Sequence, residues 1–151
     1  MSVDVRELVA GDLAAWRPLW DGYNAFYGRS GDTALPEEVT RTTWRRLLNP
    51  DEPVHGLAAR IDDRLVGIAH HLFHRSTTAV GPVCYLQDLF TAEVARGRGV
   101  GRALIEATAV RAEAGGAARL YWQTHETNAV AQVLYNNVAE RSGFIVYRKQ
   151  L

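Results

Sequence analysis

The chain has 151 residues, of which 47% are hydrophobic, and its seventeen basic residues balance seventeen acidic ones. This length suits one domain with a sizeable core, so we expect a single domain over residues 1–151. A neutral balance gives no indication of nucleic acid or an anionic membrane as a partner, and we expect neither.

The single cysteine, Cys84, has no partner for a disulfide, and the charged N-terminus lacks the apolar run of a signal peptide. No apolar stretch approaches the roughly 20 residues that cross a bilayer. These features predict a reduced, cytoplasmic protein. Cys84 lies in an apolar segment with no flanking cation, so we expect it to pack rather than to act as a nucleophile.

The predicted elements begin with a strand, continue with two helices and then return to strands. Apolar residues recur at helical spacing over 13–26, and residues 36–49 predict a second helix with Pro36 in its first turn. Alternating or apolar segments bounded by turn residues predict strands over 2–9, 55–62, 64–74 and 83–91.

Residues 96–105, "RGRGVGRALI", combine glycines and arginines immediately before a predicted helix over 100–114. The start of a helix presents unpaired backbone N–H groups and the positive end of the helix dipole. Glycines allow an anion to approach the backbone, and arginines add charge-assisted hydrogen bonds. The stretch therefore predicts a site for a phosphorylated ligand, formed by Arg96, Gly97, Arg98, Gly99, Val100, Gly101 and Arg102.

The spacing of the glycines argues against two common nucleotide sites. A P-loop requires Lys followed by Ser or Thr after its last glycine, but Arg102 and Ala103 follow Gly101. A dinucleotide fingerprint requires Gly-x-Gly-x-x-Gly after the first strand, and here the glycines at 97, 99 and 101 come late in the chain.

The stretch resembles motif A of the GNAT superfamily of N-acetyltransferases, Gln/Arg-x-x-Gly-x-Gly/Ala, through Arg96, Gly99 and Gly101. The later "NAVAQVLYNNVAERSGF" looks like motif B, and the region around it resembles the branch typified by yeast histone and polyamine acetyltransferases. The resemblance implies an α/β fold whose mixed, mostly antiparallel sheet is splayed in the middle. It also implies direct transfer of an acetyl group from acetyl-CoA to a primary amine.

By resemblance, the glycine-arginine loop holds the pyrophosphate of acetyl-CoA, and the backbone of Leu89, Phe90 and Thr91 pairs with the pantetheine. An ordinary strand edge fits these three residues equally well. Asn128 is expected to cap the motif B helix, and in relatives this position also touches the CoA arm.

Tyr135, at the position of the family's motif B tyrosine, is expected to assist the departing thiolate, although a packing role is the alternative. Candidates for a general base are Asp88, if a bulge turns it toward the substrate, and Glu126, which with His125 ends a predicted strand over 119–126. A capping turn is an equally good interpretation of His125 and Glu126. Gln87 replaces the glutamate that polyamine acetyltransferases often carry.

Tyr23, Tyr27 and Trp44 are candidates to line an amine pocket together with Gln87 and His125, because an aromatic face favours a cation. His70 and His74 are too far apart along a strand to share a metal ion, so the histidines are assigned to sheet faces. The acceptor stays open among a polyamine, a lysine side chain, an amino acid and an aminated antibiotic. The resemblance implies a homodimer, formed through a C-terminal strand over 143–151, and the alternative to an enzyme is a non-catalytic acyl-CoA sensor.

Overall fold

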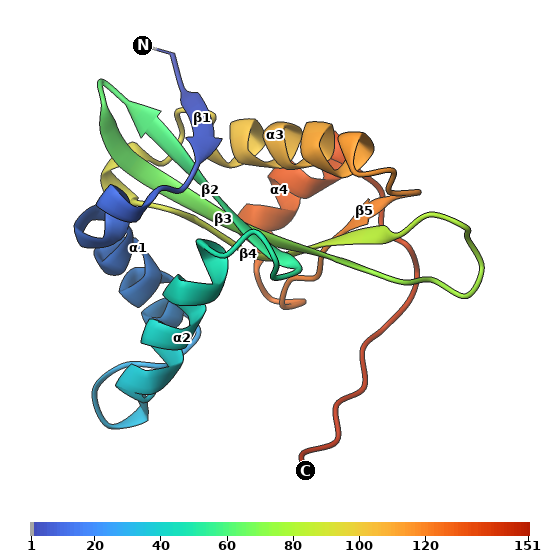
Figure 1. Cartoon of the computed structure of the whole chain (residues 1–151), viewed down its shortest axis with the longest axis horizontal. Coiled ribbons are helices and arrows are strands. Elements are labelled where there is room, and N and C mark those ends of the chain that lie inside the picture. Colours follow the sequence, from blue (N-terminus) through green and yellow to red (C-terminus); the bar gives the residue numbers. More distant parts are fainter. Residues whose placement is uncertain (1) are drawn as a thin grey trace.

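A computed structural model describes residues 2–151 and shows a mixed sheet with helices on both faces (Figure 1). The strands are β1 (Asp4–Glu7), β2 (Val54–Ile61), β3 (Arg64–His74), β4 (Val83–Thr91) and β5 (Leu120–Tyr121). The helices are α1 (Leu13–Phe26), α2 (Glu37–Leu47), α3 (Val100–Ala114) and α4 (Ala129–Val138). None of the helices in this part of the chain combines the length and the apolar character needed to cross a membrane.

The sheet has the order β1-β2-β3-β4-β5, antiparallel except for the parallel pair β4 and β5. Those two strands pair only at Cys84 with Leu120 and at Tyr85 with Tyr121. Beyond Tyr85, no strand of the described residues pairs with the β5-facing edge of β4, because β5 ends at Tyr121. This confirms the mixed, mostly antiparallel sheet, and the strands diverge between β4 and β5, the last strand in the order.

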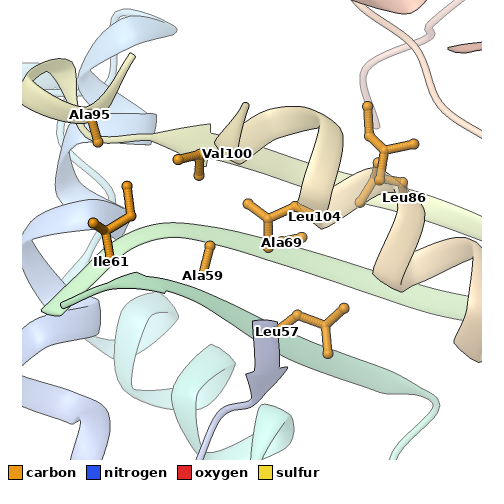
Figure 2. Packing of buried hydrophobic residues seen from close by; sticks show 9 residues of the cluster. Leu57, Ala59, Ile61, Ala69, Leu86, Ala95, Val100 and Leu104 are labelled. Atoms are coloured by element: carbon orange, nitrogen blue, oxygen red, sulfur yellow. The ribbon is translucent and has the colours of Figure 1, made fainter. Parts of the chain in front are cut away.

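Hydrophobic side chains form one cluster on each face of the sheet. The cluster under α3 includes Leu57, Ala69 and Leu104 and is shown in Figure 2. The cluster under α1 and α2 includes Trp16 and Trp20, which α1 places on its inner face one turn apart. Burial of these faces, rather than helix propensity, holds the helices on the sheet.

A β-bulge interrupts the pairing of β3 with β4. His70 lies opposite Asp88 and His71 lies opposite Leu86, so Gln87 is the extra residue in β4. Without the bulge, Leu86 and Asp88 would share a face. With it, Leu86 packs into the cluster under α3, whereas Asp88 reaches His70 on the α1 side.

Two strands predicted near the end of the chain differ from the structure. The strand predicted over 119–126 is limited to the two residues of β5. The strand predicted over 143–151 is wrong, because this segment has no regular structure and extends away from the sheet (Figure 1). An isolated strand has no partner for its backbone groups, so an alternating pattern alone does not form one.

Candidate active site

The loop before α3 has the open backbone that the sequence predicts. Gly97 and Gly99 have φ angles of +79° and +81°, and a Cβ added to either would meet no atom within 4 Å. No side chain caps α3, and its first turn contains no acidic residue. Its first N–H groups therefore face an open, electropositive surface where an anion can bind.

The three arginines of this loop, Arg96, Arg98 and Arg102, are exposed. Within residues 2–151, no carboxylate lies within ion-pair distance of any of them. Arg96 donates from Nε to the carbonyl oxygen of Thr91 at 3.3 Å, and its guanidinium lies 5.7 Å from the centre of the Phe90 ring. Its charge is thereby held beside the open edge of β4.

The remaining loop positions have a structural role. The side chain of Val100 is buried in the cluster under α3. A Cβ on Gly101 would lie 3.1 Å from Cδ2 of Leu134, so the lack of a side chain at Gly101 lets α3 and α4 pack closely. At Gly101 the structure thus gives helix packing as a reason for glycine.

Residues at the end of β4 present backbone to the open edge while their side chains pack inward. Leu89 packs against the cluster under α3, and Phe90 packs against the cluster under α1. Both pair with β3 on one side only, as does Thr91. Their other backbone groups are free of a strand partner, as the resemblance implies.

A buried hydrogen-bonded chain crosses from α1 to the bulged strand. Nε1 of Trp16 donates to Nε2 of His70 at 3.1 Å, and Nδ1 of His70 lies 2.9 Å from Oδ2 of Asp88. Trp16 is fully buried, His70 is 1% exposed, and Asp88 is 9% exposed. Asp88 is thus a nearly buried carboxylate whose Oδ2 is held by His70 and which lies close to Tyr23.

Two tyrosines, Tyr23 on α1 and Tyr27 directly after it, lie near this carboxylate. Burial, and then the negative charge of Asp88, raises the pKa of Tyr23. Burial also raises the pKa of Tyr27, which lies within the electrostatic influence of Arg29, Asp88 and Tyr85.

Tyr135 on α4 lies near Tyr27. Burial, with a smaller contribution from Tyr27, raises the pKa of Tyr135 to about 12. Its ring lies 5.5 Å from that of Trp122 in an edge-on arrangement, so the packing role is also present. A phenol with this pKa stays protonated near neutral pH and acts as a hydrogen-bond donor.

Several predicted site residues lie elsewhere. Trp44 packs against Trp16, with ring centres 4.8 Å apart, in the cluster under α1 and α2. Gln87 is exposed at the bulge.

His125 and Glu126 are exposed in the turn before α4, where Nδ1 of His125 lies 2.7 Å from Oγ1 of Thr127. The carbonyl oxygens of His125 and Glu126 accept hydrogen bonds from Nε2 of Gln132. Asn128 caps the helix by accepting from the backbone N–H of Ala131 at 3.4 Å. The structure thus shows the capping turn that the sequence left as one of two interpretations.

Comparison with known proteins supports the family that this geometry suggests. Residues 16–139 match the profile described as "Acetyltransferase (GNAT) family". The chain is 35% identical over 147 residues to the D-amino-acid N-acetyltransferase HPA3 of Saccharomyces cerevisiae, covering 96% of this chain and 89% of that protein. The chain belongs to the GNAT family of acetyltransferases.

Other relatives agree with this GNAT assignment. An uncharacterized N-acetyltransferase of Bacillus subtilis, YhfO, is 29% identical over 147 residues, covering 96% of this chain and 95% of that protein. The solved structure of a probable acetyltransferase has a TM-score of 0.83 at 25% identity and covers 98% of this chain and 97% of its own. The aminoglycoside acetyltransferase AAC(6')-Iy has the same fold, with a TM-score of 0.83 at 20% identity, covering all of both chains.

The candidate site contains two residues that the sequence did not assign to it. His70 was placed only on a sheet face, and its contact with Asp88 depends on the bulge. Tyr85 influences the pKa of Tyr27, and its hydroxyl accepts from Nε2 of Gln123 at 2.6 Å. The sequence feature that could have indicated His70 is its position in a strand predicted to pack against the tryptophans of α1. Among residues 2–151, no cluster of His, Cys, Asp and Glu side chains is arranged to hold a metal ion.

Proposed function

We propose that this GNAT acetyltransferase transfers the acetyl group of acetyl-CoA directly to the primary amine of a small molecule bound between α1 and β4. The observation that carries the proposal is the position of Asp88. It is a nearly buried carboxylate that Tyr23 and Tyr27 border, on the strand whose far edge is open. A carboxylate and aromatic rings together form a site for a cationic amine.

The proposed place for acetyl-CoA is the loop before α3 and the adjoining edge of β4. The N–H groups at the start of α3 and the unpaired arginines, Arg96, Arg98 and Arg102, fit its phosphates. The backbone of Leu89 to Thr91 fits its amide-bearing arm, since amides pair with an open strand edge. When bound, acetyl-CoA supplies the thioester that the amine attacks.

The residues of this chain must then move protons. An alkylamine with a pKa near 10.4 must lose a proton at a cost of about 4.6 kcal/mol at pH 7. Asp88 is the proposed acceptor of this proton, directly or through a water. It would take the role of the glutamate that polyamine acetyltransferases often carry at the position of Gln87. Tyr135 is proposed to donate a hydrogen bond to the leaving sulfur, because its raised pKa of about 12 favours stabilisation over full proton transfer.

Among possible acceptors we favour an amino acid. The yeast relative is described as a D-amino-acid N-acetyltransferase. In this chain, Nε of Arg29 donates to Oδ1 of Asn24 at 2.7 Å, and the guanidinium lies 5.5 Å from the Tyr27 ring centre. No carboxylate of residues 2–151 pairs with Arg29. Arg29 can therefore receive the carboxylate of a zwitterion whose amine faces Asp88.

We also propose that the protein forms a homodimer through its C-terminal segment. Phe144, Ile145, Val146 and Tyr147 are consecutive and 69–90% exposed. Contiguous exposed apolar side chains are typical of interaction surfaces, and a second copy is the proposed partner. Sedimentation should show a dimer that dissociates when Phe144 and Tyr147 are replaced by serine; a monomeric wild-type protein would contradict this.

The test of the function is thiol release from acetyl-CoA with a panel of amines, with calorimetric acetyl-CoA binding measured on the same sample. The panel contains D- and L-amino acids, their amides, spermidine, a lysine peptide and an aminoglycoside. Binding together with release that depends on a D-amino acid is the expected result. Binding without release from any amine would favour the acyl-CoA sensor, and absence of binding would overturn the donor site.

A further inference from the structure

The chain from Trp16 through His70 to Asp88 determines where the proton of the imidazole ring lies. An indole N–H can only donate, so Nε2 of His70 must accept from Trp16 and carries no proton. A neutral ring has one N–H, which is then on Nδ1, and Nδ1 lies 2.9 Å from Oδ2 of Asp88. Trp16, which can only donate, and the Asp88 carboxylate, which can only accept, therefore set the same direction for both hydrogen bonds.

Burial makes the other tautomer of His70 unfavourable. Trp16 is fully buried and His70 is 1% exposed, so water does not compete for either ring nitrogen. Reversing the tautomer would place two N–H groups against each other at Trp16 and leave Asp88 facing an unprotonated Nδ1. Both consequences leave buried polar groups unsatisfied, which is costly.

A second tryptophan of α1, Trp20, belongs to the same cluster and can be compared with Trp16. Trp20 lies one turn along α1, is also buried, and donates from Nε1 to Oγ1 of Thr40 at 3.1 Å. Its ring stacks on that of Trp16, with centres 5.5 Å apart. The Trp20 ring also lies 5.5 Å from that of His70 and 5.8 Å from that of Tyr23, so its control variant keeps an aromatic ring, phenylalanine, at this position. The N–H group of Trp20 does not bind His70, whereas that of Trp16 does.

We propose that Trp16 and His70 are positioning residues that orient the Asp88 carboxylate toward the acceptor amine. This inference deepens the proposed function and rests on it. Trp16 and Asp88 both favour the Nδ1–H tautomer, Nδ1–H binds Oδ2 of Asp88, and the carboxylate is thereby held close to Tyr23, beside the proposed amine site. The bulge at Gln87 is what brings Asp88 to the face where His70 can reach it.

The first test observes the tautomer itself and needs no activity. Nitrogen-15 chemical shifts of the histidine ring distinguish Nδ1–H from Nε2–H in the whole protein. We expect His70 to be Nδ1–H in the wild type and in both variants, and the chemical shift of its unprotonated Nε2 to move in Trp16→Phe, where Nε2 loses its donor, but not in Trp20→Phe. An Nε2–H tautomer in the wild type would overturn the proposal, whether or not the protein acetylates any amine.

The second test measures kinetics with the best acceptor of the panel. Trp16→Phe should lower kcat about tenfold, as expected when a reacting group loses its orientation, with KM for acetyl-CoA unchanged. Trp20→Phe, the matched control, should keep kcat near the wild-type value. Equal kcat in the two variants would overturn the positioning role.

A third test compares two replacements of His70, one that keeps an N–H donor to Asp88 and one that does not. Asparagine can place an N–H near the position of Nδ1, whereas leucine cannot, so His70→Asn should retain more kcat than His70→Leu. Equal kcat in two folded variants would show that the hydrogen bond to Asp88 has no positioning effect. If the wild type acetylates nothing, the proposed function fails while the tautomer measurement still decides the arrangement.

Discussion

Gly99 and Gly116 have nearly the same backbone conformation at opposite ends of α3. Their φ angles are +81° and +78°, and a Cβ on either would meet no atom within 4 Å. An alanine at either position has the same strain but different neighbours. Gly99 precedes the open N–H groups of α3, whereas Gly116 lies beyond the C-terminal end. The pair separates the effect on ligand binding from the effect on stability.

We predict that Gly99→Ala weakens acetyl-CoA binding at least tenfold relative to Gly116→Ala, measured by calorimetry, because an added Cβ would occupy the space in front of the helix. Both substitutions should cost about 1–2 kcal/mol of unfolding free energy, since both force alanine into the left-handed region. Equal affinities for the two variants would remove the loop from the donor site.

Tyr135→Phe should lower kcat on the order of a hundredfold while leaving acetyl-CoA affinity unchanged. The reason is that the raised pKa of Tyr135, about 12, keeps a proton available for the leaving sulfur. Within residues 2–151 the structure gives the hydroxyl no hydrogen bond, so the urea midpoint should not move. A large shift of that midpoint with unchanged kcat would assign Tyr135 to packing against Trp122.

Arg29→Gln should raise KM for a D-amino acid about tenfold or more, the scale of a lost hydrogen bond between charged groups, and leave KM for its amide unchanged. The amide has no carboxylate to lose. Arg45→Gln is the matched control, because Arg45 is exposed on α2 and no carboxylate among residues 2–151 pairs with it. An equal rise of KM for both substrates would exclude carboxylate recognition by Arg29.

Stability should fall as the solution is acidified because of His71. Burial, and then the nearby His55 and Arg111, lowers the pKa of His71 from 6.5 to about 4. The unfolded chain therefore binds more protons than the folded one between these values. His71 favours folding above about pH 6.5, and this contribution is lost as pH falls toward 4, by about 3 kcal/mol in total.

The measurement is urea unfolding at pH 7 and pH 4.5. His71→Phe should reduce the loss of stability between the two by about 2 kcal/mol. His74→Phe makes the same change at an exposed histidine of β3 and should not reduce the loss. A wild-type pH dependence that survives in His71→Phe would show that other groups cause it.

Local patterns by themselves determined most of the elements. The spacing of Trp16, Trp20 and Tyr23 predicted α1, and the glycines before Val100 predicted an anion site at the start of α3. The helix prediction succeeded because helical periodicity is a property of neighbouring residues, whereas the anion site stays a prediction. The same loop, with motif B, was enough to suggest the GNAT family that the comparisons confirm.

Contacts between distant segments were decided only by the tertiary structure. A one-residue register shift at Gln87 turns Asp88 toward His70, and no local pattern specifies such a shift. Packing assigned Gly101 to the contact with Leu134 and Trp44 to the contact with Trp16. The segment over 143–151 alternates like a strand, yet it forms none, because a strand exists only where another strand pairs with its backbone.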